Sequence, residues 1–382
     1  MKKSIVLMVH GLLLLCHQAL ASPQLTPYQQ LDTNGARDVT PFVIDDRHYM
    51  VIPQLAKDIP NTKANMNGGN SDVDVLIYRW RKDKFEIYQR LPGHGNESSE
   101  FFEIGSKKFL AIASIHSGPK PPFITPSYSM LYEWDGERFV PVQQFYGYAS
   151  KSWKYFNLGD RHFLALANGV VLPNSKAKHD TSSVIYEYDG QKFIPFQTIP
   201  SSWAYQWEFF TIAGKHYLGL TDHLQPSKLY RWNGKQFSPF QEFTNTGGRA
   251  FTHFKIQGLH YLAFANISHP SVLYRWNGQS FEQYQEFQGL GGRNFLFYMR
   301  GKTPYLMRIN FITGSRSNPK SNLASPLYAW KEGKFEIIQE IETFGGVNAA
   351  YFAIKDQKFI AIANSLSKDL RFKTHSILYQ LQ

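Results

Sequence analysis

Three arginines occupy corresponding places after glycine-containing turns, and their chemistry suits the binding of anions. The segments are Gly35-Ala36-Arg37, Gly247-Gly248-Arg249 and Gly291-Gly292-Arg293. A guanidinium group is a planar fork of donors that pairs with carboxylate or sulfate. The same donors can instead bond backbone carbonyls of a neighbouring structural unit, and the sequence leaves both roles open. Together with other basic and aromatic residues they form the predicted binding set: Arg37, Lys151, Lys176, Lys178, Trp203, Arg249 and Arg293.

Signatures of catalysis are missing from the sequence. It contains no Gly-x-Ser-x-Gly, no His-Glu-x-x-His, no phosphate-binding loop and no EF-hand loop. The single cysteine, Cys16, lies in an N-terminal leader, so cleavage of the leader would exclude disulfides, thiolate metal sites and a thiol nucleophile. We therefore assign no catalytic residue, expect no cofactor and leave metal binding open.

A repeated unit must position the candidate residues. The string Leu-Tyr-Arg-Trp-Asn-Gly at 229–234 returns at 273–278, and in each copy a Phe follows, with a glutamine four residues later. A second aromatic unit keeps the same register, and the spacings between its copies are 60, 54, 54, 44, 44 and 54 residues. Seven copies in one register indicate a repeat architecture. The first aromatic of this second unit is found at Phe42, Phe102, Phe156, Phe210, Phe254, Tyr298 and Phe352.

Each copy is expected to form four short antiparallel strands. Aromatic and β-branched runs alternate with turn residues, and Asp-Gly or Asn-Gly pairs such as Asn233-Gly234 mark one hairpin in four of the units. Seven such units predict an all-β, seven-bladed β-propeller. After the N-terminal leader comes a partial copy, Tyr28 to Leu31, which matches only the fourth strand of the repeat. The chain ends with another partial copy, Ile377 to Tyr379, which matches only the third strand. Residues 28–31 should therefore complete the last blade and remove its open edge.

The order of these motifs resembles the epitempin or epilepsy-associated (EAR, EPTP) repeat family. The shared pattern is Phe-x-Ile, a glycine turn, Tyr-Leu-x-x-Ala-Asn, a variable loop, Leu-Tyr-x-Trp and Phe-x-x-x-Gln, and it covers residues 28–381. Ala-Asn at 167–168, 265–266 and 363–364 is specific to the family. The resemblance, to the leucine-rich glioma-inactivated secreted proteins among others, implies a secreted seven-bladed propeller that acts as a binding module. Leucine-rich repeats are absent from this sequence, so the receptor partners of the animal proteins are not carried over.

The N-terminus has the pattern of a secretory signal. Lys2 and Lys3 are followed by an apolar run and by Ala19-Leu20-Ala21, so cleavage is expected after Ala21. The predicted organisation is a signal peptide over 1–21 and a single propeller over 22–382. The short signal is typical of bacteria, and we predict a secreted or periplasmic protein. After the leader no apolar run reaches 18 residues, so no membrane-spanning helix is expected.

One face of the expected propeller carries the long connections. The length variation lies between the second and third strands of each unit, on the same side as the inter-blade loops that hold Arg37, Lys151, Arg249 and Arg293. Variable loops on a rigid scaffold commonly carry binding residues. The formal net charge of +11 falls to +9 without Lys2 and Lys3, and basic residues gather on this face. Such a charge favours acidic partners.

For the other polar residues, a structural role is the simpler expectation than ligand binding or catalysis. The polar residue that ends each second strand, such as Asn266 or Asp222, is expected to cap loop backbone rather than to line a ligand site. His253 is expected in an innermost strand, where a single histidine is more often packed than catalytic. Glu100 and Glu208 are candidate carboxylates of the central channel.

The leading hypothesis is a non-catalytic module that binds an unidentified envelope or extracellular protein through the long-loop face. An acidic partner would suit the positive charge. The alternatives are binding of an anionic polysaccharide, or a lyase or hydrolase that acts on one, with His253 or a tyrosine as base and Arg249 neutralising the uronate. Nucleic acid is disfavoured as a partner because the chain is expected to be exported and has no motif for nucleic-acid binding.

Overall fold

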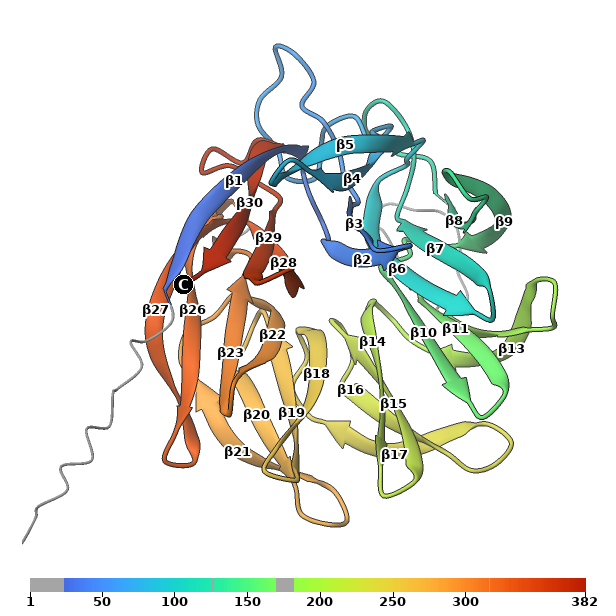
Figure 1. Cartoon of the computed structure of the whole chain (residues 1–382), viewed down its shortest axis with the longest axis vertical. Helices are drawn as coiled ribbons and strands as arrows, with labels where there is room; N and C mark the ends of the chain where they lie inside the picture. Colours follow the sequence, from blue (N-terminus) through green and yellow to red (C-terminus); the bar gives the residue numbers. More distant parts are fainter. Residues whose placement is uncertain (1–23, 126, 170–181, 316) are drawn as a thin grey trace, which may run out of the picture.

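Seven antiparallel sheets surround a central axis. The computed structural model describes residues 24–125, 127–169, 182–315 and 317–382. Within these residues the chain forms seven four-stranded sheets and one two-stranded hairpin, and no helix. Figure 1 shows the sheets as blades that follow one another in chain order around the ring. The predicted all-β, seven-bladed propeller is confirmed.

Each of the first four blades starts at the axis and ends at the outer edge, as Figure 1 shows. Their strands, blade by blade, are β2 (Thr40–Ile44), β3 (Arg47–Ile52), β4 (Val75–Arg81), β5 (Lys84–Leu91); β6 (Asn96–Ile104), β7 (Lys107–Ser114), β8 (Ser127–Trp134), β9 (Phe139–Gly147); β10 (Ser152–Leu158), β11 (Arg161–Ala167), β12 (Ser182–Tyr188), β13 (Phe193–Pro200); β14 (Ala204–Ile212), β15 (Lys215–Asp222), β16 (Ser227–Trp232) and β17 (Phe237–Phe243).

Blades 5 and 6 repeat this order, and blade 7 takes its outer strand from the N-terminus of the chain. A small hairpin, β24 (Thr313–Ser315) and β25 (Asn318–Lys320), interrupts blade 6. The remaining strands are β18 (Gly248–Ile256), β19 (Leu259–Asn266), β20 (Ser271–Trp276), β21 (Phe281–Phe287); β22 (Gly292–Arg300), β23 (Thr303–Asn310), β26 (Asn322–Lys331), β27 (Lys334–Phe344); and β28 (Gly346–Ile354), β29 (Gln357–Asn364), β30 (Lys373–Leu381) and β1 (Leu25–Asn34).

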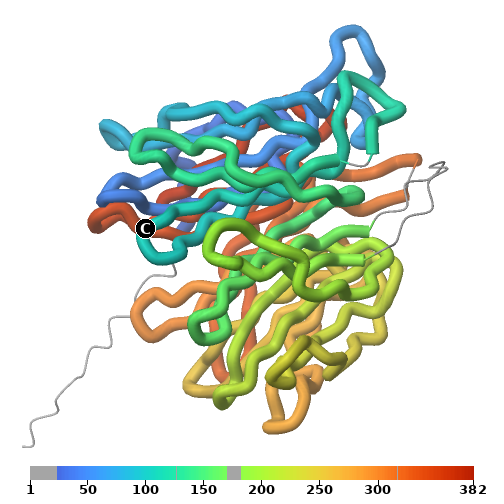
Figure 2. Tube along the Cα trace, turned by 90° about the vertical axis from the view of Figure 1, so that its right-hand side faces the viewer, coloured from blue at the N-terminus to red at the C-terminus, as the bar shows by residue number. Residues whose placement is uncertain are grey.

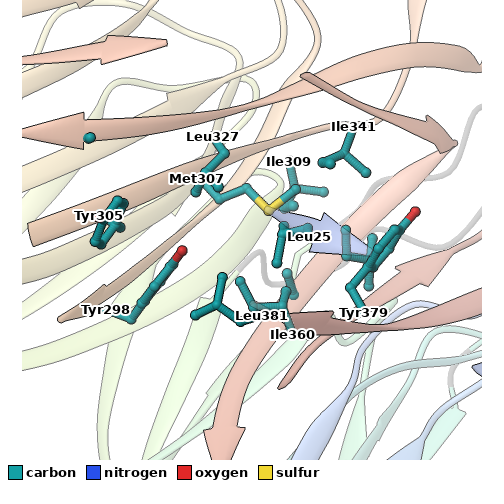
Figure 3. Packing of buried hydrophobic residues seen from close by; sticks show 13 residues of the cluster. Leu25, Tyr298, Tyr305, Met307, Ile309, Leu327, Ile341, Ile360, Tyr379 and Leu381 are labelled. Carbon is teal, nitrogen blue, oxygen red and sulfur yellow. The ribbon is translucent and has the colours of Figure 1, made fainter. Parts of the chain in front are cut away.

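The hydrophobic core lies between neighbouring blades. The second strand of a blade is buried on both faces, as in Phe359–Asn364 of β29, because a blade packs on each side of it. This explains why the second strands are continuous apolar runs rather than alternating ones. Figure 3 shows the cluster between blades 6 and 7, in which Leu25 of β1 lies among Met307 and Ile309 of blade 6 and Tyr379 of blade 7.

The long connections project from one side of the ring, as predicted. The segments that join second to third strands contain 53–74, 311–321 and 365–372, whereas blades 4 and 5 have only 223–226 and 267–270. In Figure 2 the blue loop of 53–74 and the orange hairpin β24–β25 both extend to the right-hand side. We call this side the loop face. The opposite side carries short turns such as the one between β16 and β17, where the Asn233 side chain accepts hydrogen bonds from two backbone N–H groups.

The ring is closed by pairing the two ends of the chain. Strand β1 pairs antiparallel with β30, from Leu25 opposite Leu381 to Asn34 opposite Lys373. The predicted closure is confirmed, although β1 is longer than the expected 28–31. The additional residues extend the ladder at both ends and bury Leu25 against blade 6. The predicted signal peptide, 1–21, lies outside the described residues.

The recurring glutamine joins each outer strand to the next blade. In the pair between blades 3 and 4, Gln197 Nε2 donates to the Phe237 carbonyl at 2.8 Å, and the Phe237 N–H donates to Gln197 Oε1 at 2.9 Å. A β-bulge at Phe196 directly precedes this glutamine and turns its side chain toward the neighbouring blade. The closing strand takes part twice, because Gln29 bonds Phe85 of blade 1 and Gln339 of blade 6 bonds Leu25. The same two bonds therefore recur all the way round the ring.

Replacing one of these glutamines should destabilise the propeller measurably. Gln197→Leu keeps the size of the side chain but leaves the N–H and C=O of Phe237 without their partners. We expect a loss of about 2–3 kcal/mol in the free energy of unfolding, measured by urea denaturation. Gln191→Leu, in an exposed turn, is the matched control and should change stability by no more than about 0.5 kcal/mol. Equal stability of the two variants would contradict a structural role for the glutamine bonds.

Candidate functional site

A ring of seven side chains, one from each blade, surrounds the central channel at the loop face. Each lies at the start of an innermost strand or shortly before it, five residues before the first aromatic of its repeat. Together they line a cavity of about 170 Å³. All seven residues are buried, with between 2 % and 9 % of their surface exposed. We call this set the channel ring: Arg37, Glu97, Lys151, Tyr205, Arg249, Arg293 and Val347.

The loops around the channel ring are joined by backbone hydrogen bonds. The N–H of Gly247 donates to the His223 carbonyl, and the Gly247 carbonyl accepts from the Ile267 N–H. Equivalent bonds recur at Gly35, Gly95 and Gly291. Gly247 has φ of +83°, and a Cβ there would approach the Asn266 side chain to 2.7 Å, so glycine is required at this position. The channel ring is therefore held by a rigid frame.

Glu97 is the single carboxylate of the channel ring and bonds two of its cations. Its Oε2 accepts from Arg37 Nε at 3.1 Å and its Oε1 from Lys151 Nζ at 2.7 Å, while Arg293 Nη2 lies 3.9 Å from Oε2. Burial by itself would raise the pKa of Glu97. The positive charges of Arg37, Lys151 and Arg293 outweigh burial and lower the pKa to about 2. Glu97 is therefore ionised throughout the physiological range.

The aromatic ring of Tyr205 makes cation–π contacts with three cations of the channel ring. The guanidinium carbons of Arg249 and Arg293 lie 3.9 and 4.8 Å from the centre of its ring, and Lys151 Nζ lies 5.2 Å away. Such contacts are favourable because the ring face is electron-rich. Burial would raise the pKa of the Tyr205 hydroxyl, yet that pKa lies below its ordinary value because Arg249, Lys151 and Arg293 favour the anion.

Positive charge exceeds negative charge in the channel ring. It has four cations and one carboxylate, and none of the described residues accepts a hydrogen bond from the Arg293 guanidinium. Arg249 Nη1 donates to His223 Nδ1 at 2.8 Å and to the Gly248 carbonyl, but its other nitrogens have no acceptor among the described residues. Burial and then the charge of Arg249 lower the pKa of His223 to about 4.

A second layer of charged side chains lies deeper in the channel. The predicted channel carboxylates Glu100 and Glu208 both interact electrostatically with Lys154, and Glu100 contributes most to raising the Lys154 pKa. Burial raises the pKa of both carboxyls. Each also accepts a backbone hydrogen bond, from Tyr155 N–H to Glu100 and from His253 N–H to Glu208. This layer is closer to charge balance than the channel ring.

The structure brings together most of the predicted binding residues. Arg37, Lys151, Arg249 and Arg293 all belong to the channel ring, and the Trp203 ring lies 5.9 Å from that of Tyr205. Lys176 and Lys178 lie outside the described residues. Arg37 and Lys151 lie on inter-blade connections as predicted, before β2 and β10, but the placement of Arg249 and Arg293 needs correction, because β18 and β22 already begin at Gly248 and Gly292. Their side chains are therefore buried at the channel rather than spread over the rim.

Three members of the channel ring were not predicted: Val347 and the two that carry its chemistry, Glu97 and Tyr205. Both occupy the repeat position of Arg37 and Arg249, so comparing the residue types at that one position across all copies would have identified them. His253 is packed, as expected: its ring stacks on Phe210 at 4.3 Å and bonds His260. Asn266 caps loop backbone, also as expected, through bonds from the N–H groups of Ser268 and His269.

A protein-family model described as the EPTP domain matches five segments of the chain, residues 24–81, 84–135, 138–189, 192–233 and 236–277. These segments together cover more than half of the sequence. The chain belongs to the EPTP domain family. The first match runs from β1 to β4, so a family repeat starts in the outer strand of one blade and continues into the next. The repeat family recognised in the sequence is confirmed.

The EPTP propeller is also similar to animal proteins. It is 32% identical over 164 residues to the Homo sapiens "Thrombospondin-type laminin G domain and EAR repeat-containing protein", a match that covers 42% of this chain and 23% of that protein. It is 28% identical over 93 residues to "Leucine-rich repeat LGI family member 3" of Macaca fascicularis, covering 24% of this chain and 15% of that protein. The chain thus spans less than a quarter of the length of these curated relatives.

The described part of the EPTP propeller consists of strands, turns and loops. No helix there has the length and apolar content needed to cross a membrane. No group of three or more His, Cys, Asp or Glu side chains in the same residues is arranged to hold a metal ion.

Proposed function

We propose that this EPTP propeller is an exported, non-catalytic module that binds a protein partner through its loop face. The observation that carries the proposal is the contrast between the two faces: one has long, hydrogen-bonded loops around a basic channel ring, and the other has short turns. Exposed apolar side chains on the loop face, Leu224, Leu290 and Ile124, add contact surface. The resemblance to secreted EAR-repeat proteins supports export and protein binding.

Charge reversal on the two faces tests this proposal. The loop-face variant replaces four exposed lysines by glutamate, and the control variant does the same on the opposite face, so each changes the net charge by eight units. Because charges act over a Debye length of about 8–10 Å, an acidic partner should respond to the loop-face variant only. The loop-face set is Lys57, Lys63, Lys120 and Lys320, and the control set is Lys192, Lys215, Lys235 and Lys302.

We expect the mature protein to capture a partner from envelope extract. The loop-face variant should bind this partner with an affinity at least about tenfold lower. Binding by the wild type should also weaken with salt. Both variants should melt near the wild-type temperature, because exposed substitutions change stability little. A control variant that loses the partner while the loop-face variant keeps it would contradict the proposal.

An anionic polysaccharide is the second candidate ligand, and one observation favours cleavage of such a polysaccharide by a lyase reaction. Tyr205 has a lowered pKa and lies beside Arg249, the pairing of base and carboxylate-neutralising cation that a polysaccharide lyase requires. The cavity of about 170 Å³ is smaller than the roughly 300–1,000 Å³ of common ligand pockets, which favours a small group over a sugar ring. A glycan array tests binding, and ultraviolet absorbance of an unsaturated product, absent with Tyr205→Phe, tests lyase activity.

A further inference from the structure

The channel ring contains more buried positive charge than its own residues neutralise. Glu97 satisfies Arg37 and Lys151 by hydrogen bonds, whereas Arg293 only approaches it at 3.9 Å. A buried cation without a hydrogen-bonded counter-charge is costly. Burial and then the charge of Arg37 lower the pKa of Arg293 to about 10, as expected where like charges are close together. Arg293 is about nine-tenths buried and lines the cavity.

We propose that the channel ring binds a small, doubly charged oxyanion of the phosphate or sulfate class against Arg249, Arg293 and Lys151. The ring itself holds one carboxylate against four cations, so two further negative charges bring it close to neutrality. Asp38 and Glu100 also line the cavity, but burial raises the pKa of both carboxyls, and Glu100 interacts with Lys154. Arg249 and Arg293 have nitrogens without acceptors among the described residues, and guanidinium donors are suited to such oxyanions. Tyr205 holds all three cations around one cavity, so they are preorganised.

This inference deepens the proposed function, because the channel ring lies at the centre of the loop face. The same ligand chemistry can come from the free ion or from a sulfated or phosphorylated group on a partner. Titration with the free ion tests the channel ring by itself. Saturable sulfate binding without partner capture would contradict only the protein-binding function, and partner capture without sulfate binding would contradict only this inference.

The experiment is a titration of the mature protein with sulfate and with phosphate at constant ionic strength. Binding is measured by calorimetry, and stability by thermal unfolding. We expect saturable binding in the millimolar range or tighter and a rise in melting temperature that saturates with it. Acetate, with one charge, should bind more weakly. Peptides that carry a sulfotyrosine or a phosphoserine form the second arm, and binding tighter than the free ion would assign the ligand to a partner.

Arg293→Gln distinguishes a built site from a general salt effect. Without multivalent anions this variant should melt close to the wild-type temperature. It removes a like charge beside Arg37 and Arg249, which offsets the loss of the contacts with Tyr205 and Glu97, and it breaks no hydrogen bond to a described residue. Its affinity for sulfate should fall by at least about tenfold. Lys192→Gln and Lys235→Gln, on the opposite face, should retain the full response. No saturable heat with the wild type, or an equal rise in melting temperature in Arg293→Gln, would overturn the inference, because excluded salts stabilise any protein.

Discussion

Deletion of residues 22–31 should abolish cooperative folding of the propeller. These residues include most of β1, whose ladder with β30 completes blade 7. The deletion also removes Gln29, which bonds Phe85 of blade 1, and the backbone of Leu25, which bonds Gln339 of blade 6. Leu25 and Leu31 are 4 % and 2 % exposed, and the loss of each such leucine costs about 2–5 kcal/mol. The total rivals the 5–15 kcal/mol of a typical domain.

Circular dichroism and size-exclusion chromatography measure this outcome. We expect the truncated chain to lack a sharp thermal transition or to associate through the open edge of β30. Gln29→Leu is the graded control, since it breaks one interblade link and keeps the strand, and it should remain folded. Addition of a peptide spanning residues 22–34 should restore part of the transition. A truncated monomer that melts at the wild-type temperature would refute closure by β1.

Glu97→Gln should be the most destabilising single substitution in the channel ring. It keeps the shape of the side chain but leaves Arg37 and Lys151 buried without their counter-charge. Removing one partner of a buried ion pair costs about 3–5 kcal/mol, which chemical denaturation at neutral pH would detect. Glu242→Gln, which breaks an exposed pair with Lys228, is the control and should cost no more than about 1 kcal/mol.

The pH dependence of stability provides a second measurement on the same variant. The pKa of Glu97 falls from an ordinary 4.5 to about 2 on folding, so its contribution is fully present above pH 4.5 and is lost as the pH falls toward 2. Wild-type stability should therefore decrease over that interval more steeply than that of Glu97→Gln. Parallel pH profiles would show that Glu97 does not carry the charge balance of the channel ring.

The blades could be predicted from the sequence because their determinants are local. Aromatic and β-branched runs, Asp-Gly or Asn-Gly turns and a fixed repeat register act within one copy of about 50 residues. Closure was also predictable, since Tyr28 to Leu31 and Ile377 to Tyr379 each match only part of a copy. The length of β1 was not, because the contacts that extend it come from blade 6, at residues such as Met307 and Gln339.

The site depended on tertiary structure in two respects. The sequence identified the four cations of the channel ring and the face on which they lie. It also showed that the glutamine recurs in each copy, but not that this glutamine joins neighbouring blades. Arg249 and Arg293 are buried with Glu97 and Tyr205 rather than exposed on a rim. This depends on which side of each innermost strand faces the axis and on how far that strand extends. These contacts join different blades and residues as far apart as Arg37 and Arg293. Repeat spacing determines each blade locally, but ring closure brings one position from every blade to a common axis, where their charges act on one another over a few ångströms.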